Sequence, residues 1–233
     1  MVYVNVYFHV IRENMTTEGG NVDQNTVNKQ IAVFNEYFNQ KNPMNFTFIL
    51  QETTYTTNAA WFRRGGQAGL GEDVAMSKKL RRGGCSDLNV YTVFSPQRGH
   101  AMGISSMPST CKEAISDDGI TLDHLVLPGS PYFGGMTGLV AAHELEHWLG
   151  LFHTFDGGCS YPNDHIHDTN FEKEPSFGPC EPRSSCVNGT FDAVDNISPE
   201  LRRRNLQHKF TLGQAVFAHK NWQAFRKSNY SGP

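Results

Sequence analysis

The residues best suited to chemistry in this chain lie close together in the segment AAHELEHWLGLFH, from Ala141 to His153. The segment contains the pattern HExxHxxGxxH. If residues 141–149 are helical, His143 and His147 project from one face of the helix, one turn apart. Both imidazoles can then bind the same metal ion, so the spacing predicts a helical metal-binding motif.

The other positions of the motif indicate which metal and which reaction. Gly150 can adopt a left-handed conformation that ends the helix and brings His153 round as a third nitrogen ligand. Three neutral imidazoles leave one tetrahedral position open, which is typical of a catalytic zinc rather than a closed structural one. Zinc lowers the pKa of its bound water from about 15.7 toward about 7, and Glu144 is placed to accept the proton. The motif therefore predicts zinc-dependent hydrolysis.

The composition is that of a globular protein and excludes two classes of partner. Of the 233 residues, 38 % are hydrophobic and 18 % are charged, and the formal charge is −3. Such a chain has no basic field for nucleic acid or anionic lipid. No apolar run approaches the roughly 20 residues of a membrane span. A strand pattern follows Met1 at once, so we expect no signal peptide and interpret the chain as a mature fragment.

Hydrophobic periodicity predicts the elements that position the motif. The predicted strands are residues 2–11, 46–55, 88–94, 101–107 and 119–127, and the predicted helices are residues 22–38, 72–82, 137–149 and 211–227. Asp23 is placed to cap the first helix. Residues 59–71 are polar and glycine-rich, and residues 108–118 and 155–174 are predicted to be loops. The opening strand–helix–strand order indicates a layer of helices on a sheet.

Several stretches outside the motif carry a family resemblance. TFDGGC follows the third histidine at residues 154–159, and VYVNVYFHVI, AAWF, DLNVYT and FTLGQ occupy residues 2–11, 59–62, 87–92 and 210–214. Together with HELEHWLGLFH they resemble the metzincin zinc endopeptidases of the pappalysin group, in particular its secreted fungal members. The resemblance covers nearly the whole chain.

The resemblance implies an α+β, metzincin-like fold in a single catalytic domain, residues 1–233. An upper subdomain, about residues 1–153, would hold a twisted mixed sheet and two helices. A smaller, irregular lower subdomain, about residues 154–233, would end in a C-terminal helix. The cleft between them would hold the zinc. Nothing indicates an oligomer, and we assume a monomer.

The resemblance also implies roles for individual residues. Glu144 would accept the proton of the attacking water and return it to the leaving amine, whereas Glu146 would project from the other side of the helix. A peptide or protein substrate would pair with the edge strand at residues 101–107 by β-augmentation. Gly103, Ile104 and Ser105 would then lie near the scissile bond. The alternative is that this strand is an ordinary sheet edge without a binding role.

A second ion site is predicted in the lower subdomain. The segment DHIHDT at residues 164–169 resembles the calcium-binding segment of the group. Asp164, Asp168 and the Thr169 oxygen are hard ligands suited to calcium. The softer His165 and His167 would favour a transition metal. A solvated loop without an ion is the remaining alternative.

The five cysteines indicate an oxidising compartment. The resemblance implies a Cys159–Cys186 disulfide. Cys85 and Cys111 could form a second disulfide, which would leave Cys180 unpaired, although sequence alone cannot decide the connectivity. Disulfides and five glycosylation sequons are typical of secreted proteins.

The sequence departs from the family pattern at residues 192–198, DAVDNIS. This stretch replaces the methionine turn and the tyrosine that supports the oxyanion in the group. Loss of one oxyanion donor typically lowers the rate by about 10²–10³-fold. The leading hypothesis is a secreted zinc endopeptidase. The alternative is a zinc-binding but weakly active or inactive homologue that acts as a peptide-binding or effector protein.

Overall fold

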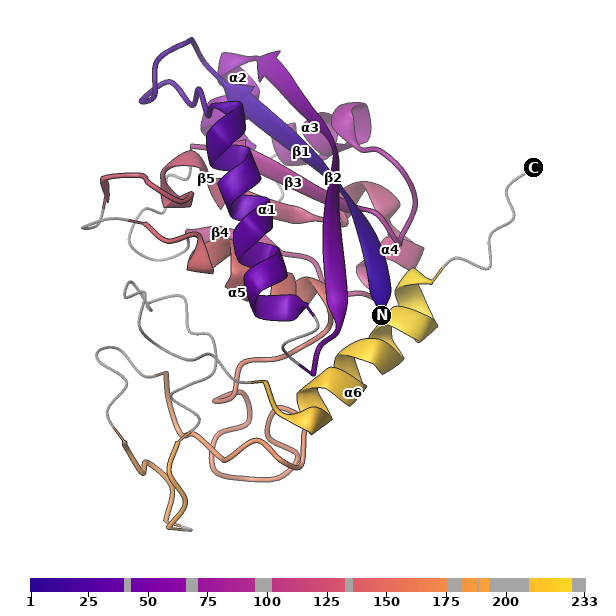
Figure 1. Ribbon diagram of the computed structural model, residues 1–233, viewed down its shortest axis with the longest axis vertical. Helices are drawn as coiled ribbons and strands as arrows, with labels where there is room; N and C mark the ends of the chain where they lie inside the picture. Colours follow the sequence, from indigo (N-terminus) through magenta and orange to yellow (C-terminus); the bar gives the residue numbers. More distant parts are fainter. Residues whose placement is uncertain are drawn as a thin grey trace.

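The computed structural model describes residues 1–39, 43–65, 71–94, 102–132, 136–175, 182–187, 189–192 and 210–227. Its strands are β1 (Val2–Arg12), β2 (Phe46–Thr57), β3 (Leu88–Val93), β4 (Gly103–Ser105) and β5 (Ile120–Asp123). Its helices are α1 (Gln24–Phe38), α2 (Ala59–Arg64), α3 (Glu72–Leu80), α4 (Thr110–Glu113), α5 (Leu139–Trp148) and α6 (Leu212–Asn221). A π-helix, Trp222–Arg226, continues α6 (Figure 1).

The strands form one mixed sheet in the order β2-β1-β3-β5-β4. Neighbours pair in parallel, except that β4 is antiparallel to β5. The predicted α+β class is therefore confirmed. β4 is the last strand in the order, so it lies at an edge of the sheet, as its flanking turns and prolines predict.

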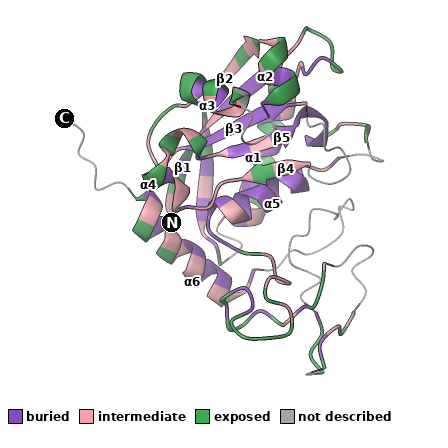
Figure 2. Cartoon of the chain, turned by 180° about the vertical axis from the view of Figure 1, so that it is seen from behind, coloured by how far each residue is buried: buried purple, intermediate pink, exposed green. Residues whose placement is uncertain are grey.

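Helices cover both faces of the sheet. Because side chains alternate along a strand, Val4, Val6, Phe8 and Val10 of β1 all enter the core that contains α1 and α5. A second core on the other face brings together residues of α2, α3 and β3, namely Phe62, Met76, Leu80, Tyr91 and Val93, with Ile11 of β1. Figure 2 shows that buried residues are concentrated in the sheet and in the helix that carries the motif. Nearly all residues of the motif helix α5 are therefore buried, with His147 the exception.

The structure also contains helices that the sequence reading placed in loops. In α2, the Asn58 side chain accepts a hydrogen bond from the Trp61 amide, which caps the first turn. The glycine-rich residues after it obscured this short helix. α4 contains Cys111, which forms a disulfide with Cys85, and Cys159 forms the other disulfide with Cys186. Both pairs agree with the expected pairing, and Cys180 lies outside the described residues.

No helix in the described part of the chain is long and apolar enough to cross a membrane. Strand and helix ends differ from expectation by a few residues. The strand predicted to reach residue 127 ends at Asp123, because the Asp123 side chain accepts a hydrogen bond from the Leu125 amide and starts a turn. α6 begins with a capping box between Thr211 and Gln214.

His9 is a buried histidine whose tautomer is determined by its neighbours. Its Nε2 lies 3.0 Å from Asn89 Oδ1, and its Nδ1 lies 2.8 Å from Thr54 Oγ1. The Asn89 amide group donates to the Arg82 carbonyl, and its oxygen accepts from the Arg82 amide, so the oxygen faces His9 as an acceptor. His9 therefore donates through Nε2 and accepts through Nδ1. Burial lowers the pKa of this neutral ring from 6.5 to about 4.

We expect the free energy of unfolding to fall as the pH is lowered from about 6.5 to about 4. In this range the unfolded chain binds a proton at His9 and the folded chain does not, at a cost approaching about 3 kcal/mol. Denaturant unfolding at several pH values in this range measures how steeply the free energy of unfolding changes with pH. His9→Gln should flatten this dependence, whereas a glutamine at the exposed His167 should not. Equal slopes in wild type and His9→Gln would contradict this assignment.

Candidate active site

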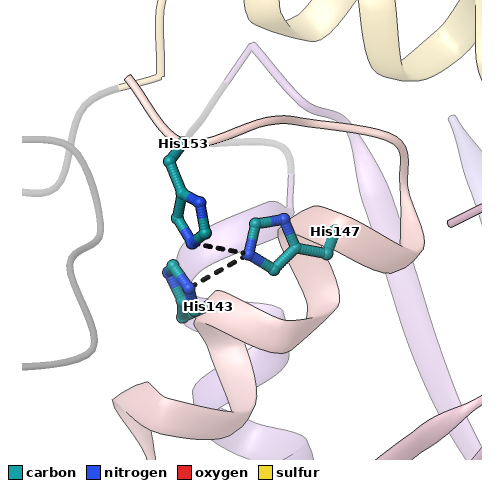
Figure 3. Close-up of side chains that lie close together, drawn as sticks. All are labelled: His143, His147 and His153. Atoms are coloured by element: carbon teal, nitrogen blue, oxygen red, sulfur yellow. Dashed lines mark hydrogen bonds between the residues drawn. The ribbon is translucent and has the colours of Figure 1, made fainter. Parts of the chain in front are cut away.

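Three histidine side chains meet at the end of α5. His147 Nε2 lies 3.1 Å from the Nε2 atoms of both His143 and His153 (Figure 3). Among the described residues, these three form the group of metal-ligating side chains that could hold an ion, with ligand atoms within 4.8 Å of one another. The structure thus brings together the three residues that the motif predicts as ligands.

The chain after α5 is shaped by a defined helix end. The Leu151 amide donates to the Glu146 carbonyl, and the Gly150 amide donates to the His147 carbonyl. These two bonds form a Schellman motif, which requires a left-handed residue after the helix. Gly150 has φ +97°, and a Cβ on it would lie 2.6 Å from the Asn221 side chain. A glycine is therefore needed for this turn, which directs the chain toward His153.

The donor set fits a zinc ion. His147 Nδ1 lies 2.8 Å from the Leu151 carbonyl oxygen and donates to it, which leaves the Nε2 lone pair for a metal. Burial is the main cause that lowers the pKa of His147, and the charge of His153 lowers it further, so the neutral ligand form is favoured. Zinc–nitrogen bonds of about 2.0–2.1 Å place tetrahedral ligands about 3.3–3.4 Å apart. The observed 3.1 Å separations are close to this value. Three converging lone pairs repel one another unless a cation lies between them.

Glu144 lies between α5 and the edge strand β4. Its side chain is buried, and desolvation raises its pKa to about 8. A Cβ added to Gly103 would lie 2.6 Å from Glu144 Cγ and 2.7 Å from its Oε1. The absence of a side chain at Gly103 therefore lets the carboxyl group approach the backbone of β4. Of the other predicted substrate-strand residues, Ile104 is exposed and Ser105 is half-buried.

Glu146, on the same helix, is also buried. Burial, and then the charge of Glu144, raises its pKa well above its ordinary value. Its Oε1 atom has no hydrogen-bond partner among the described residues. Sequence reasoning predicted that Glu146 projects away from the metal but did not anticipate that both carboxyl groups are enclosed. The apolar residues that flank the motif in the sequence indicate that this helix is buried, and they could have predicted the burial of both carboxyl groups.

The predicted calcium ligands have other partners in the structure. Asp168 accepts hydrogen bonds from the Thr211 hydroxyl and the Gly213 amide, so its carboxylate caps the start of α6. Asp164 Oδ1 accepts from the Thr169 hydroxyl and from the Ile166 amide. The structure does not bring Asp164, Asp168 and Thr169 together as free ligands. The calcium prediction finds no support here.

We expect Gly103→Ala to lower kcat by about 10–100-fold while zinc remains bound. The new methyl group must displace the Glu144 side chain, and a displacement near 1 Å can cost about 10²-fold. Peptide hydrolysis and zinc content per chain measure the two effects. Gly84→Ala is the matched control, because the atom nearest to a Cβ there is 4.0 Å away. Equal activity of both variants would contradict the close approach of Glu144 to β4.

Comparisons with known proteins agree with this geometry. The pregnancy-associated plasma protein-A family model matches residues 89–220. Extracellular metalloprotease 1 of Coccidioides posadasii is 34 % identical over 231 residues, covering 97 % of this chain and 78 % of that protein. An extracellular metalloprotease of Neurospora crassa is 32 % identical over 229 residues, covering 97 % of this chain and 76 % of that protein.

Solved structures show the same fold. Mirolysin in complex with compound 9 superposes with a TM-score of 0.72 at 20 % identity, covering 94 % of this chain and 90 % of that chain. Mature Tannerella forsythia mirolysin in complex with a cleaved peptide superposes with a TM-score of 0.68 and the same coverage. The chain therefore belongs to the pregnancy-associated plasma protein-A family, the pappalysin metalloendopeptidases of the metzincin class.

Proposed function

We propose that this metalloendopeptidase is an active, secreted zinc enzyme in which Glu144 is the general base. The observation that carries the proposal is the convergence of three histidine Nε2 atoms on the helix that also holds the buried Glu144. We also propose that residues 1–233 form one catalytic domain, with its subdomains divided near residue 153.

The chain supplies the ligands, the base and the peptide-binding edge. Bound at His143, His147 and His153, zinc supplies a Lewis acid and makes water a nucleophile near neutral pH. The charge of the bound zinc would lower the pKa that burial raises, so Glu144 would be ionised and could accept the proton from the attacking water and deliver it to the leaving amine. Because the carboxyl group is enclosed, bulk water does not compete for its hydrogen bonds.

The free edge of β4 is the proposed substrate site. Among the described strands, β4 pairs with β5 alone, and the backbone of Gly103 lies against Glu144. An extended peptide that pairs with Gly103, Ile104 and Ser105 would place one of its carbonyl groups close to that carboxyl group. Mirolysin, which has the same fold, is solved in complex with a cleaved peptide, and this supports a peptide substrate for the fold.

Secretion is supported by two observations. The relatives are named extracellular metalloproteases, and the chain contains two disulfides. Disulfides persist in oxidising compartments. The alternative of a weakly active homologue rests on the altered segment at residues 192–198, of which residues 193–198 lie outside the described residues.

The test is digestion of a protein mixture with and without a zinc chelator. We expect cleavage that stops when the chelator is added and returns when zinc is restored. Metal analysis should find one zinc per chain in the active protein. Cleavage that persists in the chelator would rule out the zinc mechanism. Bound zinc without any cleavage would favour the peptide-binding homologue.

A further inference from the structure

Arg226, at the end of the π-helix, is a fully buried cation that contacts two separate parts of the active-site region. In Figure 1, α6 and this π-helix run along the lower side of the sheet and end beside α4. In sequence, Arg226 is far from both the metal motif and the edge strand. Burial lowers its pKa to about 10, so it stays charged at neutral pH.

The first contact is with the end of the motif helix. Arg226 Nε donates to the Trp148 carbonyl oxygen at 2.8 Å, and the guanidinium carbon lies 3.6 Å from the centre of the Trp148 ring. The last four carbonyl groups of a helix have no partner within it. Here the carbonyls of residues 145–147 bond the amides of the following turn, and Arg226 bonds the fourth. A cation at this position also interacts favourably with the helix dipole.

The second contact is with the end of the substrate strand. Arg226 Nη1 donates to Asp118 Oδ1 at 2.9 Å, in an ion pair with no exposed surface on either side chain. The same nitrogen donates to the Cys85 carbonyl oxygen at 3.2 Å. The Ser106 hydroxyl donates to the same carboxylate oxygen at 2.9 Å. Ser106 directly follows β4, and its oxygen accepts from the Gly119 amide just before β5. Asp118 therefore holds the end of β4, and Arg81 binds its other oxygen.

We propose that Arg226 and Asp118 are positioning residues that set the separation between α5 and β4. One planar guanidinium group bonds Trp148, next to the ligand His147, and Asp118, which holds β4. Glu144 and Gly103 lie on these same two elements, so the Arg226 contacts determine how the base meets the bound peptide. This role rests on the proposed function, since it presumes that peptide binds at β4.

The chemistry of the guanidinium group explains why another cation would not suffice. Its donors diverge in a rigid plane and reach two acceptors at once, whereas a lysine ammonium is a compact point charge on a flexible stem. Removing either partner of a buried pair also leaves an uncompensated charge. Arg226→Lys keeps the charge but cannot keep all the bonds to Trp148, Cys85 and Asp118. Asp118→Asn keeps the shape but loses the charge.

The experiment compares Arg226→Lys and Asp118→Asn with Lys112→Met in the full zinc-loaded chain. Lys112 is the matched control, because its Nζ donates to the Ala224 carbonyl and anchors the same helix end without contacting α5 or β4. For the two test variants, assayed well below their melting temperatures, we expect kcat to fall about 10–100-fold, KM to change less than about threefold, and zinc content to stay at one per chain. Lys112→Met should keep wild-type kcat.

Hydrogen exchange gives a readout that does not depend on activity. Amides of residues 103–107 and 145–151 should exchange faster in Arg226→Lys and Asp118→Asn, while those of β1 should keep wild-type protection. Wild-type kcat and exchange in both variants would overturn the proposal. An equal fall in kcat for Lys112→Met at a similar melting temperature would also overturn it, because general destabilisation would then explain the effect. An inactive wild type would contradict the proposed function, and exchange would still decide the positioning role.

Discussion

Replacing Glu144 by glutamine is expected to lower kcat/KM for peptide hydrolysis by about 10²–10⁴-fold, the usual contribution of a general acid–base group. Glutamine keeps the size of the side chain and its place against Gly103, but it cannot accept a proton. Zinc content should stay at one per chain, since the proposed ligands are the three histidines. Steady-state kinetics together with metal analysis separates the loss of the base from the loss of the metal.

Glu146→Gln is the matched control for this variant. The two glutamates lie two residues apart on α5, and both are buried. Because Glu146 Oε1 is without a partner in the described structure, a neutral amide there should leave stability unchanged or raise it. Activity should stay within about threefold of wild type. Similar losses in both variants would indicate damage to the helix, and full activity of Glu144→Gln would exclude Glu144 as the base.

His153→Ala is expected to abolish hydrolysis by releasing zinc. Loss of an outer-shell hydrogen bond to a ligand already lowers metal affinity about 10–100-fold, so loss of a ligand should exceed about 100-fold. Two imidazoles on α5 would remain, with no third nitrogen to complete the site. Competition with a chromophoric chelator measures the zinc affinity. A denaturant unfolding curve shows whether the variant still folds.

His167→Ala is the control for this prediction, because His167 is an exposed histidine of the same loop region that stacks on Tyr161. We expect this variant to keep one zinc per chain with wild-type affinity. The same measurement tests the alternative of a second transition-metal site at His165 and His167. Tight zinc binding by His153→Ala would contradict the three-histidine site, and loss of one of two zinc ions in His167→Ala would support the second site.

The metal motif could be predicted from sequence because it depends on local geometry. Positions 143 and 147 share a helix face through the period of the α-helix, and a glycine three residues later permits the left-handed turn. Buried strands such as β1 and β3 were predicted for a similar reason, since their runs of β-branched and aromatic residues mark them. The outer elements α2 and α4 were missed because helices of six and four residues are too short to give a clear periodic signal.

Other features follow from contacts between residues far apart in the chain. Asp168 carries the kind of carboxylate that binds calcium, but in the structure it accepts a hydrogen bond from the Gly213 amide at the start of α6. The two residues are 45 positions apart in the sequence. His9 is neutral because burial lowers its pKa, and its tautomer is set by Asn89, 80 residues on, which accepts a hydrogen bond from its ring. No local pattern reports which partner a polar side chain will find, or how far burial will raise the pKa of Glu144 and Glu146.

The sequence by itself determined the candidate metal ligands and the candidate base, because these lie in one short motif with a fixed spacing, and short stretches along the whole chain indicated the family. Only the tertiary structure decided how the base is placed. Glu144 meets β4 across a glycine, and Arg226 bonds Trp148 and Asp118 over 78 and 108 residues of sequence. Helical periodicity acts over a few residues, whereas the separation of α5 and β4 depends on packing and on buried charges from the far end of the chain.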